Sequence, residues 1–420
     1  MPPRPSSEKT LTVLGSTGSI GRNTLDVAGR FPDRYPIHAL AAHTNVELLA
    51  SQIERHRPAV AVAFDPKAAE RLRDLKPNGG HTTVLSGMEG LLEAATDARV
   101  DHVVAGIVGA IGMRPAYAAI EAGKEISLAN KEALVLAGEL MLSRAEETGS
   151  RVLPLDSEHN AVFQCLNGHN PLRASAGSPE PGSMGGSRVE RIVLTASGGA
   201  FRDRPLDTFA DITREEALAH PNWAMGPKIT VDSATMMNKG LEVIEARWLF
   251  GLPPERIGVL VHRQSIVHAL VEFVDGSVLA QLGLPDMRTP IACCLAYPER
   301  LPMDLPRLNL AEVGRLEFEP VDEARYPVFF LALEALKAGG GRPAALNGAN
   351  EAVVEAYLAG AFPFTGIAAI LKQAMARLDK EAQSGALPPF VARIATVDDA
   401  VAADRHGRDL AARLIAESKS

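Results

Sequence analysis

The sequence predicts an α/β protein with an N-terminal doubly wound, Rossmann-like domain, a central α/β domain and a C-terminal α-helical domain. Over about the first 150 residues, short apolar runs alternate with helical patterns, as in parallel βαβ sheets. A second series of apolar runs begins at Val189, and an Ala- and Leu-rich stretch from Asp322 has almost no strand signal. A chain of 420 residues is also too long for one compact core.

The N-terminal domain is expected over residues 1–155. Helical spacing over Val46–His56 and Pro115–Ala122 separates apolar runs of strand length, which predicts parallel strands joined by helices. The runs are Leu11–Leu14, Ile37–Ala41, Ala59–Ala63, Val100–Ala105, Ile126–Ala129 and Val152–Leu155.

The central domain is expected over 156–296 and is interrupted by a Gly-, Ser- and Pro-rich loop at 168–188. A Pro-rich linker over 297–321 then precedes the helical domain at 322–420. The strands expected in the central domain are Arg191–Ala196, Ile257–Val261 and Val278–Gln281.

Composition excludes several classes of protein. The formal net charge of −8, without any long basic run, argues against a nucleic-acid partner. No apolar run reaches membrane-spanning length, and the start MPPRPSSEKT lacks the apolar core of a signal peptide. Three cysteines, of which Cys293 and Cys294 are adjacent, form neither a disulfide framework nor a zinc knuckle. We therefore expect a reduced, cytoplasmic protein without a membrane partner.

The first motif is Gly15–Gly21, GSTGSIG, directly after the first expected strand. Glycines at this spacing let the backbone approach a pyrophosphate at a helix N-terminus, so the motif predicts dinucleotide binding. The second strand ends in Ala41-Ala42 and then His43, Thr44 and Asn45, without the carboxylate that usually holds the ribose of NAD. Because these three side chains can donate hydrogen bonds to a 2′-phosphate, NADP is favoured over NAD.

Two carboxylates follow the strand Val152–Leu155. Asp156 and Glu158 are two apart, so in an extended chain they point the same way toward one cation. In the alternative interpretation, Asp156 or Ser157 caps the helix that follows and Glu158 favours its first turn. With Glu242 as a third oxygen ligand, the site would suit Mg²⁺ or Mn²⁺ rather than zinc.

The segment His220–Glu245 brings a His, a Trp, a Ser, an Asn, a Lys and several carboxylates into one short stretch flanked by apolar runs. An amphipathic helix is predicted from Met236, with Asn238, Lys239 and Glu242 on one face and the Ser233 hydroxyl as its cap. With His220 and Trp223 on a loop that ends at Gly226, it indicates a phosphate and metal pocket under a mobile flap near 220–226. The alternative is a surface helix with a Lys–Glu pair.

Two smaller signals agree with this pocket. Lys131 follows a strand, where a cation can meet substrate oxygens, although a solvated lysine is the ordinary alternative. Ser197 precedes Gly198 and Gly199 after another strand and can form an anion-binding nest, or else an ordinary turn.

Together these segments resemble the 1-deoxy-D-xylulose 5-phosphate reductoisomerase family. In chain order they are GSTGSIG, LANKE, DSEHN, LTASGGAF, HPNWAMG and SATMMNKGLE, and the resemblance extends from Leu11 to Ala345–Glu351 and Phe362–Ile370. It implies an NADPH-dependent oxidoreductase of the methylerythritol phosphate route to isoprenoids, a homodimer that uses Mg²⁺ or Mn²⁺. One departure is His43, where relatives often have Gly.

Residue by residue, the resemblance implies roles for three sets of positions. Contacts with NADPH are implied for Thr17, Gly18, Ser19, Ile20, His43, Thr44, Asn45, Asn130, Glu132 and Gly226. Metal ligands are implied at Asp156, Glu158 and Glu242, which with Lys131 form the catalytic set. Contacts with the sugar phosphate are implied for Lys131, Ser157, Glu158, Ser197, His220, Trp223, Ser233, Asn238, Lys239 and Glu242.

The implied reaction isomerises and reduces 1-deoxy-D-xylulose 5-phosphate to 2-C-methyl-D-erythritol 4-phosphate. Its carbon skeleton rearranges by C3–C4 cleavage and aldol recombination before NADPH reduces the aldehyde. Two other functions stay open at this point. A semialdehyde dehydrogenase would acylate a cysteine, for which Cys165 is the candidate, and a dinucleotide-sensing regulator would need a basic recognition helix, which we do not find in the sequence.

Overall fold

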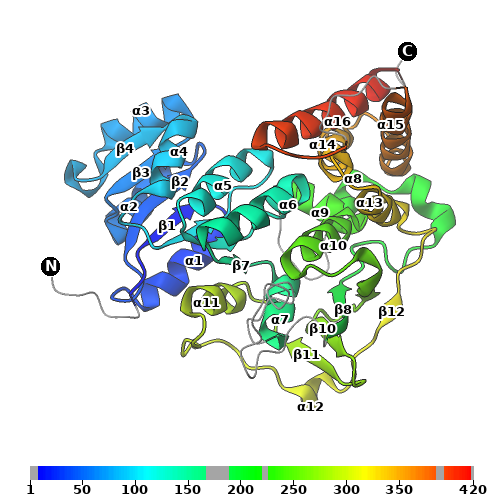
Figure 1. Cartoon of the computed structure of the whole chain (residues 1–420), viewed down its shortest axis with the longest axis horizontal. Helices are drawn as coiled ribbons and strands as arrows, with labels where there is room; N and C mark the ends of the chain where they lie inside the picture. Colours follow the sequence, from blue (N-terminus) through cyan, green and yellow to red (C-terminus); the bar gives the residue numbers. More distant parts are fainter. Residues whose placement is uncertain (1–7, 167–188, 220–225, 385–391, 418–420) are drawn as a thin grey trace. The chain divides into compact units, whose positions relative to one another are not determined.

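The computed structural model describes residues 8–166, 189–219, 226–384 and 392–417 (Figure 1). Its residues divide into two compact units. The first comprises 1–133, 141–160 and 286–305, and the second comprises 134–140, 161–285 and 306–420. Within the described ranges, no helix has both the length and the apolar character needed to cross a membrane.

The first unit contains a seven-stranded parallel sheet with the order β4-β3-β2-β1-β5-β6-β7. The chain enters at the centre of the sheet and winds outward first to one side and then to the other, so the predicted doubly wound fold is confirmed. The strands are β1 (Leu11–Leu14), β2 (Ile37–Ala42), β3 (Val60–Ala63), β4 (Thr83–Ser86), β5 (His102–Ala105), β6 (Glu125–Leu128) and β7 (Val152–Pro154).

Helices connect these strands in the manner the sequence predicts. Apolar residues of α2, such as Leu49 and Ile53, are buried in one cluster with Val13 of β1 and Leu40 of β2. Burial of such side chains contributes roughly 1.5–3 kcal/mol each. The connecting helices are α1 (Ser19–Arg30), α2 (Val46–His56), α3 (Pro66–Leu75), α4 (Gly87–Thr96), α5 (Met113–Glu121) and α6 (Lys131–Thr148). After β7 come α7 (Ser157–Cys165) and, later in the chain, α11 (Arg288–Ala296); residues 134–140 of α6 and 161–165 of α7 belong to the second unit.

The second unit contains a five-stranded mixed sheet with the order β11-β10-β8-β9-β12. Only β8 and β9 are parallel, and the other neighbours are antiparallel. The strands are β8 (Val189–Ala196), β9 (Ile257–Val261), β10 (Val267–Phe273), β11 (Val278–Leu282) and β12 (Glu319–Pro320). The prediction missed β10, whose run VHALVEF contains a His and a Glu, and it also missed β4 in the first unit.

Four helices of the second unit, α13 to α16, form the predicted C-terminal helical part. Two glycines bring α14 and α16 into close contact, since a Cβ added at Gly348 would lie 1.8 Å from the Asp404 carbonyl oxygen, and one at Gly407 equally close to that of Ala345. The helices are α8 (Arg214–Ala217), α9 (Pro227–Ala234), α10 (Met237–Phe250), α12 (Leu310–Val313), α13 (Pro327–Ala338), α14 (Arg342–Leu358), α15 (Thr365–Gln383) and α16 (Val397–Glu417).

The second unit thus holds both the mixed sheet and the C-terminal helices. The finer division into domains at 1–155, 156–296 and 322–420, with a linker at 297–321, stays a prediction.

Candidate active site

The glycine turn lies where the sequence places it, between β1 and α1. Gly15 has a φ of 85°, and a Cβ there would lie 2.7 Å from the Gly106 carbonyl oxygen, so only glycine fits. Gly18 is the N-cap of α1 and provides no side chain to its amides. The exposed first turn of α1, which holds Ser19 and Ile20, therefore offers backbone N–H groups to an anion.

The sequence analysis missed the residue that fixes this turn. Gln52 of α2 exchanges two hydrogen bonds with Ser16: the Ser16 hydroxyl donates to Gln52 Oε1 and Gln52 Nε2 donates to the Ser16 carbonyl, both at 2.8 Å. Both residues are buried, so the pair holds the glycine turn against α2. Gln52 could have been identified from the sequence, because it is a polar residue at a position of the predicted helix that faces the core.

The three side chains after β2 are all exposed. His43 lies against the Phe64 ring, with ring centroids 5.6 Å apart. Asn45 caps α2, because its Oδ1 accepts from the Leu48 amide at 3.2 Å. Capping uses the side-chain oxygen of Asn45, so the side-chain amide N–H groups take no part in the cap. Neither His43, Thr44 nor Asn45 carries a negative charge.

The segment after β6 begins α6. Asn130 is its N-cap: Oδ1 accepts from the Ala133 amide at 3.1 Å, and Nδ2 donates to the Gly109 carbonyl at 2.9 Å. These bonds tie the starts of two segments together at the carboxyl ends of β5 and β6. Asn130 and Glu132 are both buried, and the bonds of Asn130 shape this edge of the sheet.

Lys131 pairs with Asp156 across the same edge. Lys131 Nζ lies 2.6 Å from Asp156 Oδ2. This contact contradicts the solvated-lysine alternative, since both side chains are mostly buried. Asp156 and Glu158 offer carboxylate oxygens within 4.8 Å of each other, and the Ser157 hydroxyl donates to Glu158 Oε2 at 2.5 Å. The structure thus gathers a lysine and two carboxylates from separate segments of the first unit.

The fully buried His159 lies next to this group. Its Nδ1 is 3.9 Å from Asp156 Oδ2, which is within ion-pair range but beyond hydrogen-bond distance. Asn160 donates to the Pro154 carbonyl at 3.0 Å and fixes the start of α7 against β7.

In the second unit, the turn after β8 is held by three contacts. Gly198 and Gly199 have φ values of 81° and 67°, and the Ser197 hydroxyl accepts from the Gly199 amide at 3.2 Å. The Tyr326 hydroxyl donates to the Gly198 carbonyl at 2.8 Å, and Arg202 donates to the Ser197 carbonyl at 2.9 Å. The turn is therefore rigid, as an anion-binding turn must be.

Ser233 packs directly against that turn. A Cβ at Gly199 would lie 2.4 Å from the Ser233 carbonyl oxygen and 2.8 Å from Ala234 Cα. Two segments that the sequence analysis assigned to phosphate binding are therefore neighbours in the structure. No other residue would allow α9 so close to the turn, because glycine alone lacks the Cβ.

The predicted cap at Ser233 is wrong. Ser233 lies inside α9, and the N-cap of α10 is Met236, which has a φ of 58° and makes no side-chain capping bond. The two helices are separated by this left-handed residue, whose amide donates to the Ser233 carbonyl at 3.2 Å. The sequence analysis placed the start of the later helix within one residue of its position but missed α9, so it took Ser233 as a cap and not as a residue inside a helix.

The helix α10 carries the predicted polar face, but it is not amphipathic. Most of its residues are buried, including Lys239 at 4% and Glu242 at 2% exposure. Both Lys239 and Asn238 donate to Glu242, the latter at 2.5 Å. The surface Lys–Glu pair of the alternative interpretation is excluded, because a buried carboxylate needs these partners to offset the loss of water.

Three predicted site residues remain. Gly226 is the N-cap of α9 and is exposed, with nothing within 4 Å of a Cβ built on it. His220 and Trp223 lie outside the described residues. The flap that the sequence analysis expected near 220–226 therefore stays a prediction.

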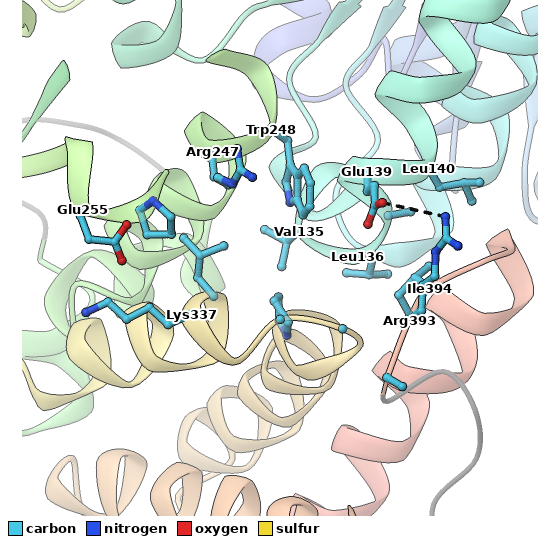
Figure 2. A pocket seen from close by; sticks show the side chains of 18 residues that line it. Val135, Leu136, Glu139, Leu140, Arg247, Trp248, Glu255, Lys337, Arg393 and Ile394 are labelled. Atoms are coloured by element: carbon cyan, nitrogen blue, oxygen red, sulfur yellow. Dashed lines mark ion pairs between the residues drawn. The ribbon is translucent and has the colours of Figure 1, made fainter. Parts of the chain in front are cut away.

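Figure 2 shows a pocket of about 390 Å³ in the second unit. It is lined by Leu136 and Glu139 of α6, Trp248 of α10, Lys337 of α13 and Arg393, and the Glu139–Arg393 pair at 4.0 Å lies at its edge. None of the predicted site residues lines this pocket, so we assign it no part in the chemistry.

Models of three domains match successive parts of the chain. Residues 11–138 match 1-deoxy-D-xylulose 5-phosphate reductoisomerase, residues 152–250 match the C-terminal domain of 1-deoxy-D-xylulose 5-phosphate reductoisomerase, and residues 282–410 match the DXP reductoisomerase C-terminal domain. The matches are in the same order as the motifs.

Curated relatives and solved structures carry the same name. The 1-deoxy-D-xylulose 5-phosphate reductoisomerase of Ralstonia pickettii is 50% identical over 407 residues, 97% of each chain, and that of Cupriavidus necator is 54% identical over 366 residues, 87% of this chain and 90% of the relative. A structure of the Zymomonas mobilis enzyme in complex with NADPH is 41% identical, with a TM-score of 0.86 over 97% of this chain and 99% of that one. A DOX-P reductoisomerase in complex with NADPH, fosmidomycin and magnesium is 42% identical, with a TM-score of 0.89 over 98% and 99%.

Proposed function

The chain belongs to the 1-deoxy-D-xylulose 5-phosphate reductoisomerase family, and on that premise we propose which of its residues bind the metal ion, the substrate and the cofactor. The protein converts 1-deoxy-D-xylulose 5-phosphate to 2-C-methyl-D-erythritol 4-phosphate with NADPH and a divalent metal ion. The observation that carries the assignment of residues is the gathering of Lys131, Asp156 and Glu158 at one edge of the first sheet.

We propose that Asp156, Glu158 and Glu242 hold the metal ion. The fit is supported by the donor set, because carboxylate oxygens suit Mg²⁺ or Mn²⁺. The fit is also supported by the contacts of the buried Glu242, because hydrogen bonds from Asn238 and Lys239 fix the orientation of its carboxylate, as a metal ligand requires. When bound, the ion supplies positive charge that polarises the ketone and stabilises negative charge on the neighbouring oxygens.

Lys131 is assigned to the substrate oxygens near C2 and C3. Its ammonium group already lies 2.6 Å from Asp156, so it sits among the proposed metal ligands and adds a second positive charge there. Ser157 donates to Glu158 and so orients that carboxylate, and His159 lies near Asp156. These residues hold the substrate oxygens while the carbon skeleton rearranges.

The phosphate is assigned to Ser197, Ser233, Asn238 and Lys239. The support is the direct contact of the Gly199 turn with Ser233, together with the position of Asn238 and Lys239 just beyond Met236. Amides, hydroxyls and one ammonium group are the donors that phosphate oxygens require.

NADPH is assigned to the glycine turn and to the ends of β2 and β6. NADPH supplies the hydride that reduces the aldehyde. Its pyrophosphate would lie on the first turn of α1, near Thr17, Gly18, Ser19 and Ile20. The adenosine 2′-phosphate would then meet His43, Thr44 and Asn45, while Asn130, Glu132 and Gly226 are assigned to other parts of the cofactor.

The two other functions are not favoured. Burial raises the pKa of the Cys165 thiol to about 11, so it would not supply the thiolate that a semialdehyde dehydrogenase needs. A dinucleotide-sensing regulator does not require a lysine and three carboxylates for binding a metal ion and substrate oxygens. The homodimer and the cytoplasmic location stay predictions.

The assay that tests the proposed function uses purified full-length protein with 1-deoxy-D-xylulose 5-phosphate, NADPH and Mn²⁺. Loss of NADPH absorbance is expected, and removal of the metal with a chelator should abolish it until Mg²⁺ or Mn²⁺ is restored. NADPH that stays unoxidised under these conditions would refute the assignment.

Lys239→Ala is expected to raise the substrate KM and the dissociation constant of a phosphonate-hydroxamate inhibitor together, by about one to two powers of ten. The reason is that both ligands present an anionic end to the same ammonium group. The measurement is steady-state kinetics with inhibitor titration. Lys239→Arg, which keeps the charge, is the matched variant, and inhibitor binding that does not change in Lys239→Ala would contradict the phosphate assignment.

A further inference from the structure

The carboxylate of Asp232 is buried in the second unit with a partner on each oxygen. The side chain is 1% exposed, and its Oδ2 lies 2.9 Å from Lys228 Nζ, one turn earlier in α9. Its Oδ1 accepts from Asn350 Nδ2 of α14 at 2.8 Å. A buried charge is strongly disfavoured unless such partners compensate for the loss of water, so this arrangement is specific.

Asn350 is fully buried and reaches Asp232 across 118 residues of sequence. This bond ties the C-terminal helices to α9. An eight-residue helix has little stability of its own, so the position of α9 depends on its contacts with neighbours.

The backbone of Ser233, which directly follows Asp232, packs against the phosphate turn. Its carbonyl oxygen lies 2.4 Å from where a Cβ at Gly199 would be, and it also accepts from the Met236 amide. A small shift of α9 would therefore move Ser233 relative to the Gly198-Gly199 turn. Such a shift would weaken the binding of an anion that needs hydrogen-bond donors from both α9 and the turn.

We infer that Asn350 is a positioning residue for the phosphate end of the substrate, because it holds Asp232 and through it Ser233 of α9. The inference rests on the proposed function, in which Ser233 binds the phosphate. Asn350 does not itself touch the substrate in this arrangement. The C-terminal helices thus contribute to specificity for a phosphorylated substrate and not only to the stability of the fold.

The chain contains a matched control one helical turn away. Asn347 of α14 is also fully buried, and its Nδ2 donates to a buried carboxylate, Asp404 Oδ1, at the same distance of 2.8 Å. Asp404 belongs to α16, so this bond joins two C-terminal helices and does not involve α9. A purely structural role predicts equal effects for the two asparagines.

The experiment compares Asn350→Ala with Asn347→Ala in the full-length protein. Asn350→Ala is expected to raise the KM for 1-deoxy-D-xylulose 5-phosphate about tenfold, since it removes a hydrogen bond to a charged group, while NADPH affinity is kept. Asn347→Ala should lower the melting temperature to a similar extent and change KM by less than about twofold. Amide hydrogen exchange over 227–234 should become about tenfold faster in Asn350→Ala alone.

A double variant provides the rescue. Asn350→Asp alone places a second carboxylate against Asp232, so it should raise KM more than Asn350→Ala does. Asp232→Asn combined with Asn350→Asp restores one donor and one acceptor, so its KM should return toward the wild-type value.

Two outcomes would overturn the inference, and they are distinguishable. An active wild type whose two alanine variants show the same KM and the same exchange over 227–234 overturns the role of Asn350 alone. A wild type that does not oxidise NADPH with the sugar phosphate overturns the proposed function and the phosphate role of Asn350 with it.

Discussion

Glu242→Gln is expected to lower kcat by about a thousandfold, because loss of one charged metal ligand removes several kcal/mol of electrostatic stabilisation and about 1.4 kcal/mol is tenfold in rate. Glutamine keeps the shape of the side chain and can still accept the hydrogen bond from Asn238. It removes the charge that faces both Lys239 and the proposed metal ion. NADPH affinity should stay nearly intact, since Glu242 is not among the residues assigned to the cofactor.

The measurement is kcat as a function of Mn²⁺ concentration, with NADPH binding followed separately by fluorescence. Because the variant leaves the buried Lys239 without its charged partner, the melting temperature is recorded to separate misfolding from loss of the ligand. Glu242→Asp, which keeps the charge on a shorter side chain, should retain more activity than Glu242→Gln. Wild-type turnover of Glu242→Gln at limiting Mn²⁺ would show that Glu242 is not a ligand.

The parallel sheet of the first unit was predictable because its strands are buried on both faces. Runs such as Val60–Ala63 are wholly apolar, and the glycine turn marks the end of the first strand. The strand β4 was missed because Thr83–Ser86 begins and ends with a hydroxyl residue and is only partly buried. The strand β10 was missed because Val267–Phe273 includes His268 and Glu272 in an otherwise apolar run.

The candidate site was predictable where the residues follow strand ends. Lys131, Asp156 and Glu158 each come just after a strand of a parallel sheet, and the ends of such strands share one edge. The short helix α9 was missed, and the left-handed conformation of Met236, which separates α9 from α10, was not predictable because tertiary contacts and not local preference set it. The bond between Asn350 and Asp232 was not predictable either, because no local pattern relates two polar residues on distant helices.

The site also shows why particular glycines are needed. At Gly199 the missing Cβ makes room for the Ser233 carbonyl, and at Gly15 it makes room for the Gly106 carbonyl. Sequence analysis explained these glycines by close approach to an anion. The structure adds a second reason, which is that each lets two segments of the same site touch.

A preference for NADPH over NADH by a factor of about one hundred is expected, since a few charge-assisted hydrogen bonds to the 2′-phosphate are worth roughly 1.5–3 kcal/mol each. The exposed side chains His43, Thr44 and Asn45 offer such bonds at the end of β2, and none of them is acidic. The measurement is kcat/KM with each cofactor at saturating substrate and metal. Equal efficiency with both would show that these residues do not read the 2′-phosphate.

Asn45→Asp separates the two roles of Asn45. Aspartate keeps the oxygen that caps α2 through the Leu48 amide, so the melting temperature should not fall. It replaces the amide donors with a negative charge, which repels a 2′-phosphate but can accept from the ribose hydroxyls of NADH. The ratio of kcat/KM for NADPH to that for NADH should therefore fall by about tenfold or more, mainly through weaker NADPH binding. If the ratio stayed unchanged in a variant of wild-type stability, Asn45 would be only a helix cap, and the preference would have to come from His43 and Thr44.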